Sequence, residues 1–200
     1  MQQLDRRVQH LSKLTLHPRA QQMVKPLALE YAFSEALEAG TEVRLAAMGF
    51  TGETLADPLK NTLQALSVNP RRTVSLRVLV PDLSKSIEVP GLVDTDGKIS
   101  DAPYFREHLK RQIAEYERSL QCQVQRMADQ QRGTLTVKFR MLHMSPSLKL
   151  YFINSNVMYE GIYDKLDLRP NPWATAAPVA DHRLLDLIGQ DSFLTRWSTD

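Results

Sequence analysis

Apolar residues recur at helical spacing in several stretches of the chain, and this spacing predicts amphipathic helices. The stretches cover residues 4–14, 18–39, 53–66, 104–131 and 181–197. The first is a narrow stripe in a polar segment, formed by Leu4, Val8, Leu11 and Leu14. A helix this short is marginal in water, so the stripe needs a partner. That partner is either the rest of the chain or a second copy.

Other stretches have the pattern of strands, either alternating or almost continuously apolar. They are Glu42–Phe50, Thr73–Pro81, Thr134–His143, Leu148–Ile153 and Val157–Tyr163. The last two are joined by a short polar segment, residues 154–156, that suits a tight hairpin turn. Residues 82–102 follow Pro81, carry Pro90, Gly91 and Gly97, and predict a long irregular excursion. The order predicts an α/β fold in which a mixed sheet is flanked by helices, with further helices at both ends of the chain.

Composition limits the possible classes of protein. With 200 residues and 42% hydrophobic content, we expect an N-terminal helical extension (1–17) and one compact α/β domain (18–200). A net charge of +2 gives no evidence of direct nucleic-acid binding. The chain has one cysteine, Cys122, which excludes an internal disulfide and suits a reducing cytoplasm. It has no signal-peptide pattern and no apolar run near the roughly 18 residues that span a bilayer, so we expect a soluble cytoplasmic protein without membrane contact.

One motif carries candidate chemistry. Ser147, Lys149 and Asn154 stand at the offsets of an H-x-K-x4-D pattern. A serine hydroxyl without a neighbouring base is a poor nucleophile for phosphorus, and an asparagine amide carries no charge to stabilise an imidazolium. A lysine ammonium still binds phosphate as a point charge. These residues therefore favour phosphate binding without turnover.

The pattern resembles the active-site motif of the phospholipase D superfamily. In that superfamily the histidine is the nucleophile, the lysine neutralises phosphate charge and the acid orients the imidazole. Only Lys149 is retained here. The resemblance covers residues 24–164, including the element order and Gly161, which stands where the superfamily has a glycine after the motif. It implies a catalytically degenerate domain built as one phospholipase D-like half.

A closer resemblance is to the phospholipase D-like effector regions behind helix-turn-helix domains in bacterial transcription regulators. The similar features are the tyrosine-bearing stretch 159–163, the proline-rich stretch 170–178 and the final stretch 193–197 with its tryptophan. The chain itself shows no helix-turn-helix pattern. Because active members of the superfamily combine two motif copies, the resemblance implies a homodimer in which Lys149 of each subunit approaches a shared cleft.

Two further residues lie near the motif. His143 would share a strand face with Ser147 and Lys149 if the strand ran unbroken through Pro146, and Glu160 follows on the next strand. The other histidines lack metal-ligand spacing, so we expect no metal and no cofactor. These histidines are His10, His17, His108 and His182. The adjacent arginines at 71 and 72 predict a solvated turn.

Three functions remain open, and the lost nucleophile makes an enzyme the less favoured class. The first is a non-catalytic regulatory or sensor domain that binds a phosphate-bearing small molecule or a protein partner. Its candidate ligand-binding residues are Ser147, Lys149, Asn154, His143 and Glu160. The second is an active phosphodiesterase or nuclease that uses His143 and Lys149. The third is an interaction scaffold, in which the same cleft is closed by packing and the N-terminal stripe does the pairing. Apart from these functions, Lys149 can be interpreted simply as the solvent-facing residue of a strand with one wet face.

Overall fold

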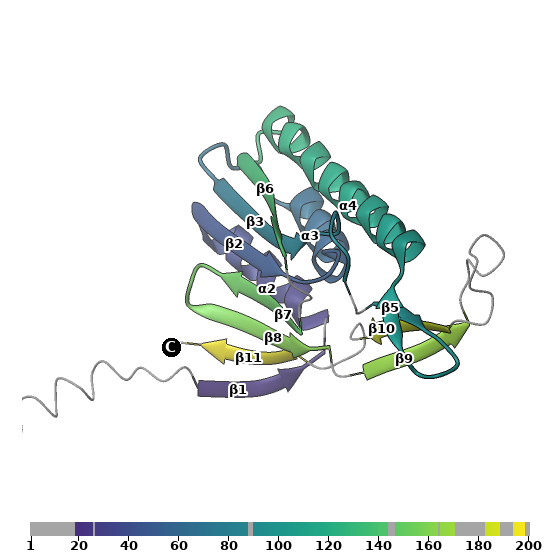
Figure 1. Ribbon diagram of the computed structural model, residues 1–200. Coiled ribbons are helices and arrows are strands. Elements are labelled where there is room, and N and C mark those ends of the chain that lie inside the picture. The colour runs from purple at the N-terminus through teal and green to yellow at the C-terminus, as the bar shows by residue number, and fades with distance from the viewer. Residues whose placement is uncertain are drawn as a thin grey trace, which may run out of the picture.

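The computed structural model describes residues 19–25, 27–87, 90–143, 147–163, 165–170, 183–188 and 194–198. It confirms the predicted α/β fold, because the chain contains both helices and strands and the strands form a mixed sheet (Figure 1). The predicted N-terminal helix, residues 1–17, lies outside the described residues. The division of the chain at residue 18 therefore stays a prediction.

The elements form a larger sheet, a smaller sheet and a set of helices. The described helices are α2 (Leu27–Ala39), α3 (Glu53–Ala65) and α4 (Pro103–Asp129). The larger sheet contains β1 (Arg19–Val24), β2 (Glu42–Met48), β3 (Thr73–Pro81), β6 (Thr134–Leu142), β7 (Leu148–Ile153), β8 (Val157–Ile162) and β11 (Leu194–Ser198). The smaller sheet contains β4 (Gly91–Val93), β5 (Ile99–Asp101), β9 (Lys165–Pro170) and β10 (Arg183–Ile188).

The larger sheet has the strand order β1-β11-β8-β7-β2-β3-β6. Its β2, β3 and β6 strands are parallel, and the crossovers between them contain α3 and α4. The remaining pairs are antiparallel. The ends of β2, β3 and β6 and the start of β7 therefore meet at one edge of the sheet, which we call the carboxyl edge.

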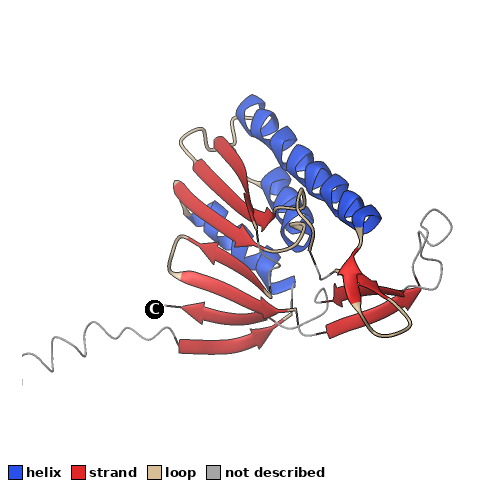
Figure 2. Ribbon diagram, in the orientation of Figure 1, coloured by secondary structure: helices blue, strands red, loops and turns tan. Residues whose placement is uncertain are grey.

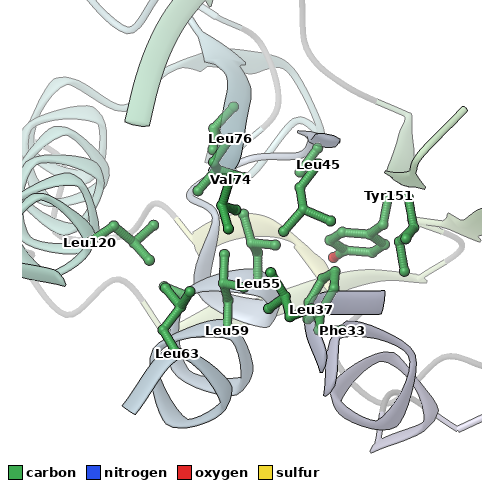
Figure 3. Close-up of a cluster of buried hydrophobic side chains, with 14 of the residues drawn as sticks. Phe33, Leu37, Leu45, Leu55, Leu59, Leu63, Val74, Leu76, Leu120 and Tyr151 are labelled. Atoms are coloured by element: carbon green, nitrogen blue, oxygen red, sulfur yellow. The ribbon is translucent and has the colours of Figure 1, made fainter. Parts of the chain in front are cut away.

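The main core lies on one face of the larger sheet, which we call the helix-covered face. Alternate residues of β2 and β3 are buried there, and all three described helices contribute leucines, phenylalanine or methionine to the same cluster. Figure 2 shows the helices on one side of the sheet, and Figure 3 shows Leu55, Leu59 and Leu63 of α3 packed among strand residues such as Val74. The opposite face carries the intervening residues, and we call it the open face.

A second apolar cluster lies at the carboxyl edge, between the larger sheet and the smaller one. Phe50 and Leu83 follow β2 and β3, Leu92 and Leu184 come from the smaller sheet, and Phe105 comes from the first turn of α4. Apolar side chains therefore cover this edge where β2 and β3 end. This cover decides how exposed the candidate site is.

Three predicted elements were wrong. Residues 181–197 contain strands β10 and β11 instead of a helix, because β10 pairs with β4 and β9 while β11 joins β1 to β8. Residues 19–24 form a strand, and the helix begins only at Leu27, because Lys25 precedes a proline and that position disfavours helical geometry. The excursion 82–102 contains β4 and β5. Short apolar runs fit helix and strand equally, and pairing with distant strands decides between them.

Candidate functional site

Lys149 is buried on the helix-covered face of β7. It shares that face with Tyr151 and Ile153 of the main core, and only 1% of its surface is exposed. The residues alternating with it face the open side and are Leu148, Leu150 and Phe152. The interpretation of Lys149 as the solvent-facing residue of this strand was therefore wrong, because the lysine is inside and the apolar residues are outside.

Gly161 makes room for the lysine side chain. It is the register partner of Lys149 on β8, and both residues face the core. A Cβ atom added at Gly161 would lie 2.4 Å from Cε and 2.8 Å from Cγ of Lys149, well inside van der Waals contact. The lysine chain thus runs across the backbone of β8, and this requires glycine at 161.

Tyr163 connects Lys149 to the end of β2. Its ring centroid lies 5.9 Å from the Lys149 Nζ, within the range of a cation–π contact. Its hydroxyl oxygen accepts a hydrogen bond from the Phe50 N–H at 3.1 Å, and the two rings meet edge to face at 5.3 Å. Burial raises the pKa of the Tyr163 hydroxyl despite that hydrogen bond. Tyr163 therefore stays protonated at neutral pH and is no nucleophile.

Residues 49–52, which include Phe50, form the turn between β2 and α3. Gly52 has a φ of +86°, a left-handed conformation that favours glycine, and the helix starts at the next residue. Thr54 in the first turn of α3 hydrogen-bonds Tyr151, the core neighbour of Lys149. The N–H groups at a helix N-terminus favour negative charge. We call Lys149, Gly161, Tyr163 and residues 49–52 the Lys149 site, and its chemistry suits an anion.

Ser147 is the one other predicted residue close to this site. It comes directly before β7, and its carbonyl accepts a hydrogen bond from the Tyr163 N–H at 3.0 Å. It is exposed, in contrast to Lys149. Ser147 therefore lies at the outer end of the Lys149 site.

Asn154 lies at the other end of β7. Five residues of extended chain separate it from Lys149, a distance of about 17 Å. Its backbone N–H donates a hydrogen bond to the Arg44 carbonyl at 2.8 Å. Its side-chain Oδ1 accepts one from the Arg44 N–H at 2.9 Å. Its φ is +51°, which asparagine tolerates better than most residues. Asn154 therefore has a structural role in the hairpin turn, where it connects the end of β7 to β2. It does not lie near Lys149.

His143 and Glu160 are also kept apart from Lys149. His143 is exposed at the end of β6, three strand spacings or about 14 Å across the sheet from β7. Glu160 faces the open side as the register partner of Leu150, and it accepts a hydrogen bond from Trp197 Nε1 at 3.0 Å. The five predicted ligand-binding residues therefore do not form one cluster.

A buried arginine was missed by the sequence analysis. Arg72 is 1% exposed, and it donates hydrogen bonds to the carbonyls of Ser67 and Arg132 at 2.9 Å and to a Glu38 carboxylate oxygen at 3.1 Å. The predicted solvated turn is thus wrong at this position. Glu38 stands 34 residues earlier in the chain, so no local pattern announces the contact.

In the described ranges, no group of three or more histidine, cysteine, aspartate or glutamate side chains could hold a metal ion. The expected absence of a metal and a cofactor stays a prediction. Among the described helices, none has the length and apolar character needed to cross a bilayer.

No family model matches the sequence, and no curated protein matches it. The assignment to a family therefore stays an expectation from the motif.

Proposed function

We propose that the protein is a non-catalytic, phospholipase D-like regulatory domain of the cytoplasm that binds a phosphate-bearing ligand at the Lys149 site. One observation carries the proposal: a lysine is held inside the fold, beside the turn that begins α3. A lysine ammonium can hold a phosphate group as a point charge, and the N-terminus of a helix favours the same negative charge. From α2 to β8 the element order is the one that the resemblance implies, apart from the short strands β4 and β5 between β3 and α4.

The enzyme alternative has less support. A phosphodiesterase that uses His143 and Lys149 needs both side chains on one phosphate, which is only a few ångströms wide. Within one subunit β2 and β3 lie between the strands that carry them. Tyr163, which lies beside Lys149, stays protonated and is therefore no general base. These contacts favour binding over hydrolysis.

A specific observation favours the scaffold as the second candidate. With Lys149 only 1% exposed and apolar side chains covering the carboxyl edge, the site is closed in this conformation. In this reading the lysine packs within the fold, and the domain acts by binding a protein partner.

The homodimer is a further part of the proposal, and it rests on the single motif copy. Light scattering at micromolar concentration should give about twice the mass of the 22.8 kDa chain. A mass equal to that of one chain would count against the shared cleft.

A thermal-shift screen tests the proposed ligand class. The wild type, Lys149→Met and the control Lys98→Met, which changes an exposed loop lysine, would each be heated with inorganic phosphate, nucleotides and sugar phosphates. A ligand that binds the folded state raises Tm, so the proposal expects a shift in the wild type and the control that is lost in Lys149→Met. An equal shift in all three proteins would place the ligand elsewhere. No shift with any compound, together with a stable Lys149→Met protein, would favour the scaffold.

A further inference from the structure

The open face of the larger sheet carries a continuous apolar patch. Six residues from β2, β7, β8 and β11 meet there through cross-strand register: Met48, Leu148, Leu150, Phe152, Met158 and Trp197. Phe152 is 37% exposed, and the other five are partly exposed. In a sheet with one wet face, these are the positions where polar residues are expected. We call these six residues the open-face patch.

Three cations border this patch on the neighbouring strands. Ala46 of β2 separates Phe152 of the patch from Arg77 of β3, because it is the register partner of both. Lys138 of β6 is the register partner of Arg77 on the other side. Arg140 follows on the same face of β6. All three are exposed, and within the described part of the chain none takes part in an ion pair. We call Arg77, Lys138 and Arg140 the basic strip.

The charges decide which occupant fits. A second copy would bring the same three cations, while both carboxylates described on this face are already engaged. Glu42 pairs with Arg44 at 2.6 Å, and Glu160 bonds Trp197. A copy therefore offers no free carboxylate from this face for the basic strip.

Nucleic acid is also a poorer fit than a protein. Single-stranded nucleic acids stack on aromatic rings. Four of the six patch residues are leucine or methionine, and the two aromatic residues are Phe152 and Trp197, whose N–H is bonded to Glu160. The open-face patch can bury the apolar side chains of a protein partner, and the cations of the basic strip can pair with its carboxylates.

We propose that the open face docks an acidic amphipathic segment of another protein, with its apolar side on the open-face patch and its carboxylates over the basic strip. The four strands of the patch span about 14 Å, which matches the 10–12 Å diameter of a helix with its side chains. This surface lies on the opposite side of the sheet from Lys149 and does not depend on phosphate binding.

Selection from a random peptide library displayed on phage tests the proposal. Peptides would be selected on the full chain and then measured by fluorescence anisotropy against two triple variants. The first reverses the basic strip (Arg77→Glu, Lys138→Glu and Arg140→Glu). The control reverses exposed cations elsewhere (Lys98→Glu, Arg111→Glu and Arg118→Glu). Circular dichroism would check that both variants keep their fold.

The proposal expects selected peptides rich in aspartate or glutamate and in large apolar residues. Their affinity should fall about tenfold or more with the strip reversed, and change little with the control. Phe152→Thr should weaken the same peptides without a change in net charge. Peptides that bind both triple variants equally, or that lack acidic residues, would overturn it. So would a homodimer that Phe152→Thr dissociates, or binding of a single-stranded oligonucleotide that the strip reversal abolishes while no peptide binds.

Discussion

Replacing Gly161 by alanine tests the packing that holds Lys149 inside the fold. The added Cβ would lie 2.4 Å from Cε and 2.8 Å from Cγ of Lys149, and 2.8 Å from a methyl carbon of the buried Leu194. Carbon atoms in contact are normally 3.5–4.0 Å apart, so each neighbour must move by roughly 1 Å. Overpacking of this kind costs about 1–3 kcal/mol of unfolding free energy.

A double-mutant cycle separates the two neighbours of Gly161. Lys149→Ala removes Cγ and Cε but leaves Leu194, so Gly161→Ala should cost less in the Lys149→Ala background. We expect a coupling energy of about 1 kcal/mol between the two changes, within the range of contacting residues. Urea denaturation of the wild type, both single variants and the double variant, followed by circular dichroism, measures it.

A matched cycle provides the control. Gly97 has a positive φ, and a Cβ added there would meet no atom within 4 Å, so Gly97→Ala is costly for a reason unrelated to Lys149. Its cost should add to that of Lys149→Ala. Additive costs for Gly161→Ala as well, within about 0.4 kcal/mol, would mean that the lysine chain does not lie across β8, and would refute the reasoning.

The remaining predictions concern residues outside the Lys149 site. Arg72→Met removes a donor from two carbonyls and from Glu38, which keeps its bonds from Ser67, and should lower the free energy of unfolding by about 2 kcal/mol, measured in urea. A loss under about 1 kcal/mol would contradict the network around Arg72. The pKa of Glu38 lies below its ordinary value, first because Ser67 donates to it and also because Arg72 is near. A lowered pKa gives stability that is present above the unfolded pKa and is lost as the pH falls through the folded one. The urea midpoint of the wild type should thus fall towards that of Glu38→Gln in acid, and a constant difference from pH 7 to pH 3 would exclude this link. Asn154→Ala removes the bond to the Arg44 N–H and places alanine at a positive φ, so it should cost about 1–2 kcal/mol without changing any Lys149-dependent ligand shift; a loss of ligand response at unchanged stability would return Asn154 to the ligand site.

Much of the fold was predictable because its elements are long or strongly patterned. The strand Thr73–Pro81 and the strand Leu148–Ile153 have the predicted bounds, and the predicted helix 104–131 is α4 within a few residues. In each case the periodicity extends over enough residues to distinguish a helix from a strand. The C-terminal residues carry short apolar runs that fit both, and only their pairing with β4, β8 and β9 makes them strands.

The candidate site was less predictable, because it depends on which face of a strand is buried. The alternation of Leu148, Lys149 and Leu150 fits a strand with Lys149 facing the solvent and equally a strand with Lys149 facing the core. A shift of one residue in register exchanges the two faces of the strand. The resemblance singled out Gly161, but its contact with Lys149 and that of Tyr163, 12 and 14 residues away, are recognisable only once the register of β7 and β8 is known. The sequence predicted a hairpin turn at residues 154–156, and Asn154 lies in that turn.

The central claim is that Lys149 binds the phosphate of a ligand. The most direct measurement is nuclear magnetic resonance of the protein carrying 13C at the lysine Cε positions, titrated with inorganic phosphate and with any compound that stabilises the protein. The Lys149 signal is assigned by its loss in Lys149→Met. The account predicts that this signal shifts and saturates with the ligand, while the Lys98 signal stays in place. Saturation of other lysine signals with an unchanged Lys149 signal would contradict the claim.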